Sequence, residues 1–162
     1  MLYLAFKYFK IFIICFKIYK IYYRIYTEVI ILKKKVKVVG AIIENDSYEI
    51  LCALRSPKMV QGNLWEFPGG KIEEGETISE AIVREIKEEL KCDIEFIEEF
   101  NDNTHEYENV IVNLITARCK IVSGTPKAYE HSKLIWLPIE NLETLKWAPA
   151  DIPAVKKLIE KV

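Results

Sequence analysis

The segment formed by residues 69–92, GGKIEEGETISEAIVREIKEELKC, constrains this chain more than any other. Its first half is a glycine-rich loop. Its second half has apolar residues at the three- and four-residue steps that are typical of a helix. Thr77 followed three positions later by Glu80 is the signature of a capping box. The spacing therefore predicts a loop that leads into a helix with a well-marked start at Thr77.

Three glutamates, Glu85, Glu88 and Glu89, fall on one face of this predicted helix. Carboxylates at this spacing repel one another, and a solvated acidic face is their ordinary explanation. That explanation does not account for the glycine loop directly before the helix or for Arg84 beside the cluster. A hard cation such as Mg²⁺ binds carboxylate oxygens and keeps waters that a phosphate can replace. A glycine pair also lets backbone carbonyls approach closely, so the pattern indicates a metal–phosphate site.

The same segment resembles the signature of the Nudix hydrolase family, and more specifically of its MutT-type nucleoside triphosphate pyrophosphohydrolases. The positions that match in register are Gly70, Glu76, Arg84, Glu85, Ile86, Glu88 and Glu89. The chain departs from the family at Lys91, where the family has glycine, and at Cys92, where it has an aliphatic residue. Lys91 falls at the expected end of the helix, where glycine tolerates positive φ, so we expect a cost of roughly 1 kcal/mol there. The carboxylates are unaffected by this departure.

The rest of the chain predicts an α/β domain. Extended segments are expected at residues 33–46, 48–55, 64–67, 93–103, 110–122 and 133–137, with a helical turn at 140–145 and an amphipathic helix within 149–162. Strands and helices in this order give a mixed sheet with helices on both faces. The resemblance implies the Nudix fold, a mixed β-sheet sandwiched between helices (α/β/α), over residues 34–161.

The net charge of −1 over 162 residues is unevenly distributed. Residues 1–28 carry +4, which leaves −5 on residues 29–162. An acidic body argues against nucleic-acid binding, which needs a basic face. The cysteines form no CxxC pair and no His/Cys cluster, which excludes zinc and thioredoxin-like sites. Cys52, Cys92 and Cys119 lie among apolar residues and are expected to be buried free thiols, as suits a reducing cytoplasm.

Residues 1–28 are almost wholly Ile, Tyr, Phe and Lys and are expected to lie outside the catalytic domain, residues 29–162. The uncharged run 11–16 is far shorter than the roughly 20 apolar residues of a spanning helix, and no small-residue cleavage site marks a signal peptide. Two interpretations remain. The segment forms a basic amphipathic helix on an anionic membrane surface, with five cations on one face, or it is not native protein but translated AT-rich DNA. We favour the second.

The resemblance also implies a set of catalytic and metal-binding residues. The glutamates Glu85, Glu88 and Glu89 and the Gly70 carbonyl would bind Mg²⁺, which Mn²⁺ can replace, and Arg84 would orient the glutamates. Glu130, in the stretch AYEHSKLIW, matches the position of a further family glutamate that acts as a ligand or as the base. A surface glutamate with no function is the alternative.

Substrate recognition is expected away from the metal. Arg55 and Lys71 are candidates for contacts with the phosphates, with an exposed structural charge as the alternative for each. The segment WAPADIPAV resembles the corresponding part of the cytidine-nucleotide branch of the family, and its Asp151 would read the base or would cap the last helix. Phe67, Trp65 and Trp147 are candidates for stacking on a base or for the core. No role is assigned to His105 or His131.

The sequence thus predicts Mg²⁺-dependent hydrolysis of a nucleoside triphosphate to the monophosphate and pyrophosphate, as in sanitation of the nucleotide pool. Either 8-oxo-dGTP or a cytidine triphosphate is the expected substrate. Hydrolysis of ADP-ribose or of dinucleoside polyphosphates is the alternative within the family. A non-catalytic nucleotide-binding module is the alternative outside enzymes, although such modules usually lose the box carboxylates. The protein is expected in the cytoplasm as a monomer or homodimer, with membrane contact only through residues 1–28.

Overall fold

The computed structural model describes residues 13–26 and 33–161, and the chain divides into two units, Met1–Lys34 and Lys35–Val162. In the first unit, residues 13–26 form a helix on which every residue is exposed. Lys17, Lys20 and Arg24 belong to this helix, whereas Lys7 and Lys10, expected on the same face, lie outside the described residues. Within the described ranges no helix combines the length and the apolar character needed to cross a bilayer.

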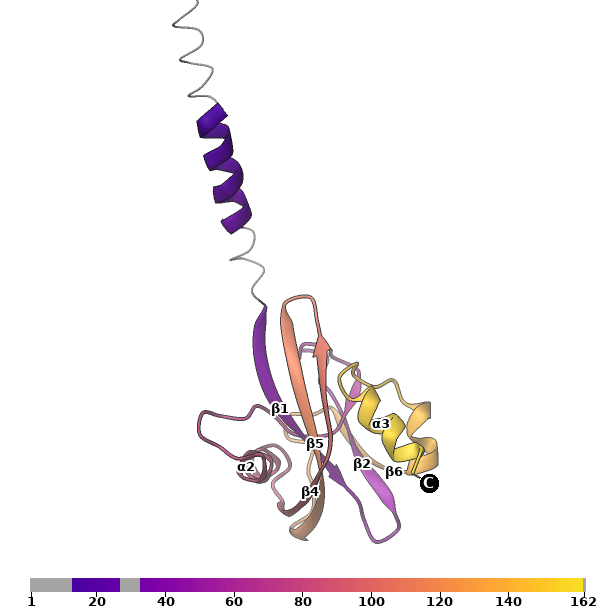
Figure 1. The fold of residues 1–162 in the computed structure, drawn as a ribbon. Coiled ribbons are helices and arrows are strands. Elements are labelled where there is room, and N and C mark those ends of the chain that lie inside the picture. The colour runs from indigo at the N-terminus through magenta and orange to yellow at the C-terminus, as the bar shows by residue number, and fades with distance from the viewer. Residues whose placement is uncertain (1–12, 27–32, 162) are drawn as a thin grey trace, which may run out of the picture. The chain divides into compact units, whose positions relative to one another are not determined.

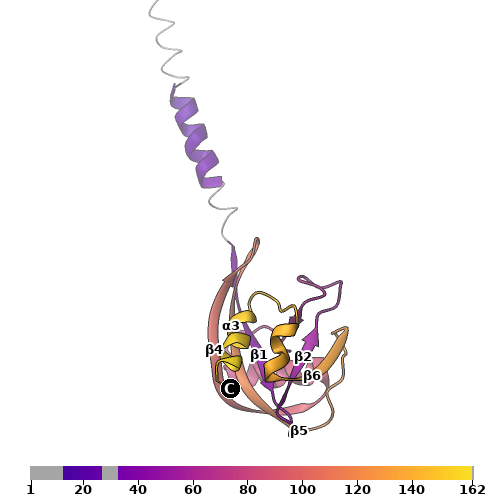
Figure 2. The ribbon, with the colours of Figure 1, turned by 90° about the vertical axis from the view of Figure 1, so that its right-hand side faces the viewer.

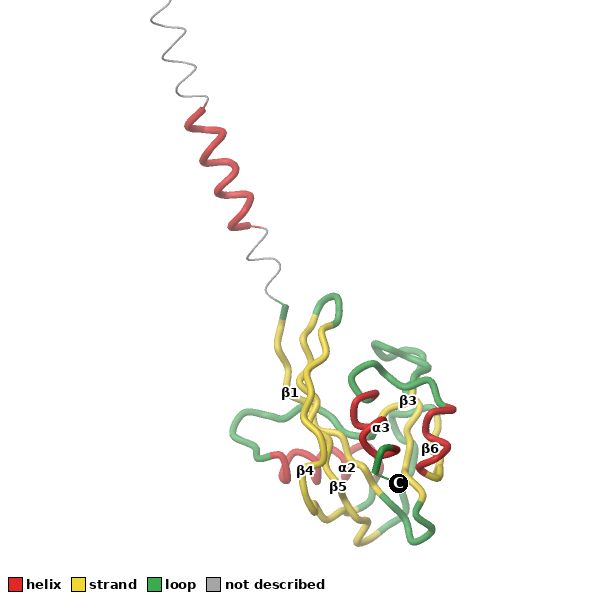
Figure 3. The backbone as a smooth tube through the Cα atoms, turned by 45° about the vertical axis from the view of Figure 1, so that its right-hand side comes forward, coloured by secondary structure: helices red, strands yellow, loops and turns green. Residues whose placement is uncertain are grey.

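The second unit contains the elements that carry the site (Figure 1). They are β1 (Lys34–Ile43), β2 (Glu49–Leu54), β3 (Trp65–Glu66), α2 (Ile78–Leu90), β4 (Asp93–Glu106), β5 (Val110–Ser123), β6 (Lys133–Pro138), the 3₁₀ helix η1 (Ile139–Thr144) and α3 (Ile152–Ile159). The strands form two three-stranded sheets, in the orders β1-β5-β4 and β3-β2-β6. Figure 3 shows the long β4–β5 hairpin beside β1. The order of elements predicted from the sequence is confirmed, with β4 extending three residues further than expected.

Helices α2 and α3 cover opposite faces of the strands, as Figure 1 shows, and Figure 2 views the domain from the side of α3. Because side chains alternate along a strand, β1 contributes to two cores. Val39, Ala41 and Ile43 pack with the buried face of α2, whereas Ile42 packs with α3. Strand β2 alternates in the same way, with Leu51 in the first core. The predicted α/β class, with strands between helices, is therefore confirmed.

Helix α2 begins and ends as its sequence indicates. The Thr77 side chain accepts a hydrogen bond from the Glu80 N–H, and the Glu80 carboxylate accepts one from the Thr77 N–H, which completes the predicted capping box. At the other end Lys91 has φ 57° and ψ 31°, the left-handed conformation that glycine adopts at lower cost. The positive φ expected at the position where this chain lacks the family's glycine is therefore present.

The segment from β3 to Ile72 links the two sheets and places the glycine loop. Strand β3 pairs with β2, and the chain then runs alongside β1. There the Ala41 N–H donates to the Pro68 carbonyl at 2.8 Å, and the Val39 N–H donates to the Gly70 carbonyl at 2.8 Å. These bonds fix the loop on β1 at the start of α2. The chain that leaves β3 and the loop that leads to α2 are thereby both held beside β1.

Candidate active site

The glycine pair lies between β1 and α2 with no room for side chains. A Cβ on Gly69, at φ 152°, would lie 2.2 Å from the Val39 carbonyl oxygen. A Cβ on Gly70 would lie 2.3 Å from the carboxylate of Glu85. The missing side chains therefore let the backbone of the loop approach a carboxylate of the helix directly.

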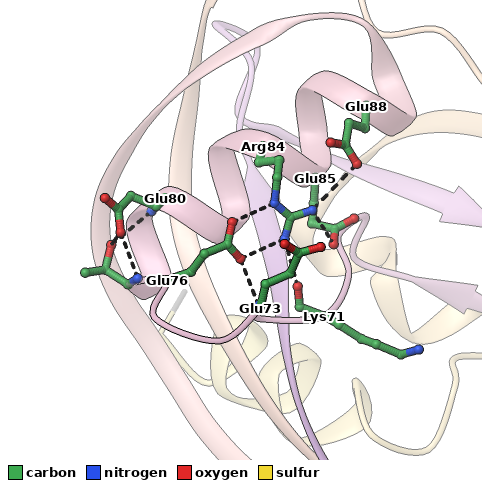
Figure 4. Close-up of polar contacts among 8 residues, drawn as sticks. Lys71, Glu73, Glu76, Glu80, Arg84, Glu85 and Glu88 are labelled. Carbon is green, nitrogen blue, oxygen red and sulfur yellow. Dashed lines mark hydrogen bonds and ion pairs between the residues drawn. The ribbon is translucent and has the colours of Figure 1, made fainter.

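The Arg84 side chain lies among the carboxylates of Glu76, Glu85 and Glu88, which are called the outer carboxylates below (Figure 4). Its Nε donates to Glu76 Oε1 at 2.7 Å, and its Nη2 donates to Glu76 Oε2 at 2.8 Å. Its Nη1 donates to Glu85 at 2.9 Å and lies 3.6 Å from Glu88. The hydrogen bonds from Arg84 lower the pKa of Glu76 to about 2. Arg84 thus contacts Glu76, Glu85 and Glu88, and its Nη2 also donates to the carbonyl of Lys71 at 3.0 Å.

Glu89 has a different environment from the outer carboxylates. Only 8% of its surface is exposed, and it accepts a hydrogen bond from the Gly69 N–H at 3.2 Å. Burial is the main cause that raises the pKa of Glu89 to about 7; the charge of His131 acts against this shift, and the charges of Glu66, Glu85 and Glu130 add to it. Like charges held together in this way favour a bound cation.

The donors at this place fit a hard divalent cation. They are carboxylate oxygens and a backbone carbonyl, the ligands that Mg²⁺ and Mn²⁺ prefer. In the part of the chain that the structure describes, no three His, Cys, Asp or Glu side chains are arranged to hold a metal ion. Glu85 accepts a hydrogen bond from Arg84 Nη1, and Glu89 accepts one from the Gly69 N–H.

The predicted contacts with substrate are placed as follows. Lys71 is exposed, and its side chain extends away from the carboxylates (Figure 4). Arg55 is engaged by the protein itself, because its Nη1 donates to Glu66 Oε2 and its Nε donates to the Val60 carbonyl at 2.9 Å. Glu130 is exposed in the bend before β6. Glu130 directly precedes His131, whose imidazole lies 3.0 Å from Glu66.

Asp151 and Phe67 meet although they are far apart in the sequence. Asp151 is 5% exposed, and its Oδ1 accepts a hydrogen bond from the Phe67 N–H at 3.0 Å. Burial raises the pKa of Asp151 to about 8, against the effect of this hydrogen bond. Asp151 stands at the start of α3, but its side chain makes no capping hydrogen bond. The alternative role of a side-chain cap is therefore wrong, because the carboxyl group turns to Phe67 instead.

The Phe67 ring belongs to the core. It is 3% exposed and lies against Trp147, with 4.9 Å between the ring centroids. Trp147 is itself buried, and its indole N–H donates to the Leu142 carbonyl at 2.7 Å. Of the aromatic residues considered for stacking, Trp65 is half-buried. Phe67 thus faces Asp151 through its backbone N–H.

Sequence reasoning missed the pairing of Glu66 with His131. The His131 side chain is 1% exposed, and its Nε2 lies 3.0 Å from Glu66 Oε1. Burial acts to lower the pKa of His131, but the hydrogen bond with Glu66 and the charges of Glu89 and Glu66 raise it overall. A signal was present, since Glu66 directly precedes the Phe-Pro-Gly-Gly loop and His131 directly follows Glu130. Neither position alone indicates the contact.

An open hollow of about 760 Å³ borders the outer side of α2. Glu76 and Arg84 line it, but Glu89 and Asp151 do not. The hollow therefore adjoins the exposed side of the Arg84 cluster. It does not reach the interior where Asp151 meets Phe67.

Comparison with known proteins agrees with this geometry. A family model described as the NUDIX domain matches residues 34–158. The CTP pyrophosphohydrolase of Escherichia coli (strain K12) is 38% identical over 123 residues, which are 76% of this chain and 90% of that protein. The 8-oxo-dGTP diphosphatase of the same organism is 31% identical over 125 residues, 77% of this chain and 97% of that protein.

One solved structure is similar to this chain in both sequence and fold. It is the solution NMR structure of the DNA mismatch repair protein MutT, a Nudix hydrolase, from methicillin-resistant Staphylococcus aureus 252. It is 47% identical to this chain with a TM-score of 0.67, and the match covers 81% of this chain and 100% of the other. The fold implied by the resemblance is thereby confirmed.

Proposed function

Because this chain belongs to the Nudix family, we propose that it hydrolyses a nucleoside triphosphate to the monophosphate and pyrophosphate. The observation that carries this proposal is the Glu85 carboxylate directly over Gly70, on the helix that also holds the buried Glu89. The relatives named above act on CTP and on 8-oxo-dGTP. Their similarity extends over almost their whole length. We therefore infer the same reaction class for this enzyme.

The metal ion would be Mg²⁺ or Mn²⁺, held by Glu85, Glu88, Glu89 and the Gly70 carbonyl. Glu130 would complete the site as a further ligand or as the base. When bound, the ion neutralises charge on the phosphates and lowers the pKa of a coordinated water. The residues of the chain do the rest.

Arg84 keeps the glutamates oriented through its hydrogen bonds to Glu76 and Glu85. Its guanidinium fork matches carboxylate geometry, which a lysine would not. Lys71 is exposed on the glycine loop, and its ammonium group would meet a phosphate that lies over this loop. Arg55 donates a hydrogen bond to the Val60 carbonyl and would hold the loop after β2 near the substrate. The phosphates would thus be held between the glycine loop and α2.

The base would be read at Asp151. With its pKa raised to about 8, the Asp151 carboxyl group retains a proton near neutral pH. A protonated carboxyl group both donates and accepts hydrogen bonds, so it can pair with N3 and the N4 amino group of cytosine or with a purine edge. This supports cytidine triphosphates and 8-oxo-dGTP as the substrates to test first. Removal of a damaged or unwanted nucleotide from the pool would be the biological role.

Two other functions are less well supported. Hydrolysis of ADP-ribose or dinucleoside polyphosphates would use the same carboxylates, but the chain matches 90% and 97% of the triphosphate-hydrolysing relatives. A non-catalytic binding module has no use for the glutamates of α2, which this chain retains in full. Cys52, Cys92 and Cys119 are buried free thiols, which agrees with our proposal that the enzyme works in the reducing cytoplasm, as a monomer or homodimer.

The deciding experiment is a screen for pyrophosphate release in the presence of Mg²⁺. The substrates are CTP, dCTP, 5-methyl-dCTP, dGTP, 8-oxo-dGTP and ADP-ribose. We expect pyrophosphate and a nucleoside monophosphate from at least one triphosphate, and no reaction when Mg²⁺ is chelated. Hydrolysis of ADP-ribose alone would replace this proposal by its alternative. Binding of a nucleotide without turnover would identify the non-catalytic module.

A further inference from the structure

Glu66 stands on a short strand that is held from both sides. Strand β3 pairs with β2 on one side. On the other side the Trp65 N–H donates to the Lys146 carbonyl at 2.9 Å, and the Ala148 N–H donates to the Trp65 carbonyl at 2.7 Å. Trp65 and Phe67 pack in the core that contains α3, so Glu66 between them points to the other side of the strand. Its carboxylate is carried by a fixed backbone.

The two oxygens of Glu66 bind two different segments. Oε2 accepts a hydrogen bond from Arg55 Nη1, and Oε1 lies 3.0 Å from His131 Nε2. An ionised carboxylate can only accept, so the His131 Nε2 carries the hydrogen of this bond. Arg55 in turn donates from Nε to the Val60 carbonyl in the loop after β2. One side chain thus joins that loop to the segment before β6.

His131 is the anchor of an otherwise exposed segment. Its side chain is 1% exposed, whereas Glu130 and Ser132 on either side are exposed. The Ser132 N–H donates to the Leu54 carbonyl at 2.8 Å. The imidazole and this backbone bond attach the segment to the sheet. The position of Glu130 therefore depends on the contact of its neighbour with Glu66.

Glu66 also lies between the two halves of the site. Its neighbour Phe67 donates its backbone N–H to Asp151 Oδ1, in the proposed base site, at 3.0 Å. Its partner His131 directly follows Glu130, the further candidate ligand or base. Glu66 thus stands next to a residue that contacts the base site and contacts the neighbour of Glu130.

We propose that Glu66 is a positioning residue that holds Glu130 in place through His131. The same carboxylate holds the loop after β2 through Arg55. Glu66 would therefore couple the part of the site that binds the nucleotide to the part that performs hydrolysis. This inference rests on the proposed function, since it concerns the same site.

The test compares Glu66→Ala, His131→Ala and the double variant. Each single change should lower kcat about 10- to 100-fold, as loss of a partner that orients a ligand typically does. The double variant should be no slower than the slower single variant, because both changes remove the same restraint. KM should rise only with Glu66→Ala, since that change also releases Arg55. An additive double variant would overturn the proposal.

Glu66→Gln separates the contact with Arg55 from the contact with His131. It also replaces Glu66→Ala as the test if that variant does not fold. Glutamine keeps one oxygen to accept from Arg55 and places an NH₂ group, which cannot accept, against the His131 Nε2–H. We expect a reduced kcat with KM close to that of the wild type. A folded Glu66→Gln enzyme with unchanged kcat would refute the role through His131.

A second readout needs neither metal nor substrate. The chain has two histidines, so their imidazole signals in NMR are readily distinguished. Glu66→Ala should shift the His131 imidazole signal and the backbone amide signal of Glu130. The imidazole signal of His105, a residue of β4 whose ring lies against that of Tyr107, should stay unchanged. An unmoved Glu130 amide would refute the proposal even if the wild type releases no pyrophosphate. Absence of pyrophosphate release in the wild type would refute only the proposed function.

Glu44→Ala is the matched control. Glu44 is also a half-buried glutamate paired with an arginine, Arg118, at 3.5 Å. Its contacts are with Arg118 of β5 and, through a backbone bridge, with Ile50 of β2. We expect kcat, KM and the Glu130 amide signal to remain those of the wild type. A similar loss in this control would mean that the Glu66 effect reports general destabilisation.

Discussion

Two carboxyl groups of this enzyme, Glu76 at the surface and Asp151 in the interior, have opposite protonation. The hydrogen bonds from Arg84 lower the pKa of Glu76 to about 2, whereas burial raises the pKa of Asp151 to about 8. Glu76, in the cluster around Arg84, therefore remains ionised. The interior group keeps a proton and suits the edge of a base. The difference arises from solvent access and partners, since the functional group is the same.

The strongest way to test the surface cluster is to remove one charge from it. The Glu88 side chain is 60% exposed and only 3.6 Å from Arg84, so Glu88→Gln should leave the fold intact. We expect kcat for pyrophosphate release to fall by about 100-fold or more, because a lost ligand should cost at least as much as a lost orienting partner. Steady-state kinetics with Mg²⁺ and the thermal midpoint measure the two effects. Stability should change by less than about 0.5 kcal/mol.

Glu74→Gln is the control for this change. Glu74 is exposed in the same glycine loop, but it is outside the positions that match the family. Its substitution should leave kcat unchanged. An unchanged rate in Glu88→Gln would remove the basis for a metal site on α2.

The interior group is tested by Asp151→Asn. Asparagine keeps an oxygen that can accept from the Phe67 N–H but does not titrate. The pKa of Asp151 is raised from 3.8 to about 8, so between these values the folded protein holds a proton that the unfolded chain has lost. The wild type must therefore lose stability as pH rises through this window, and the variant must lose less. At about 1.4 kcal/mol per pKa unit, the gap amounts to a few kcal/mol.

Urea unfolding of both proteins at about pH 5 and about pH 9 measures this gap. The variant should gain stability relative to the wild type at the higher pH. Its ranking of triphosphates should change as well, since an amide presents a fixed donor and acceptor. Parallel stability curves for the two proteins would show that Asp151 is ionised in the folded state, and the contrast with the surface cluster would then disappear.

The two regions also differ in how far sequence reveals them. The surface cluster is local, since Gly70, Glu76, Arg84 and Glu85 fall within one loop and one helix whose spacing predicts their contacts. The interior contacts are not local. The Phe67 N–H meets Asp151 across 84 positions, and Glu66 meets His131 across 65. No periodicity links such positions, because only the packing of β3 between its neighbours brings them together.

The end of α2 provides a smaller test, in which stability should change without any change in chemistry. Lys91→Gly relieves the cost of a left-handed conformation at φ 57°, which is about 1–2 kcal/mol for a residue with a Cβ. It also loses the contact of the Lys91 ammonium with the Tyr129 ring at 5.1 Å and gains freedom in the unfolded chain. We expect a net gain of about 0.5 kcal/mol in the free energy of unfolding, measured in urea, with kcat unchanged.

Lys91→Ala separates these contributions, because it removes the ammonium group and keeps the strain. It should be less stable than both the wild type and Lys91→Gly. A glycine variant that is no more stable than the alanine variant would show that the backbone at Lys91 is not strained. A change in kcat would show that the end of α2 affects the carboxylates.

The smallest effect is expected from deletion of residues 1–28. The family match begins at residue 34, and the second structural unit begins at Lys35, so both carboxyl environments lie wholly within the part that remains. We expect the truncated enzyme to keep its kcat, KM and pH-dependent stability, measured beside the full chain. If truncation instead prevents folding, the segment belongs to the catalytic domain. If activity changes only with anionic vesicles present, the exposed helix over residues 13–26, with Lys17, Lys20 and Arg24, acts at membrane surfaces as a basic amphipathic helix would.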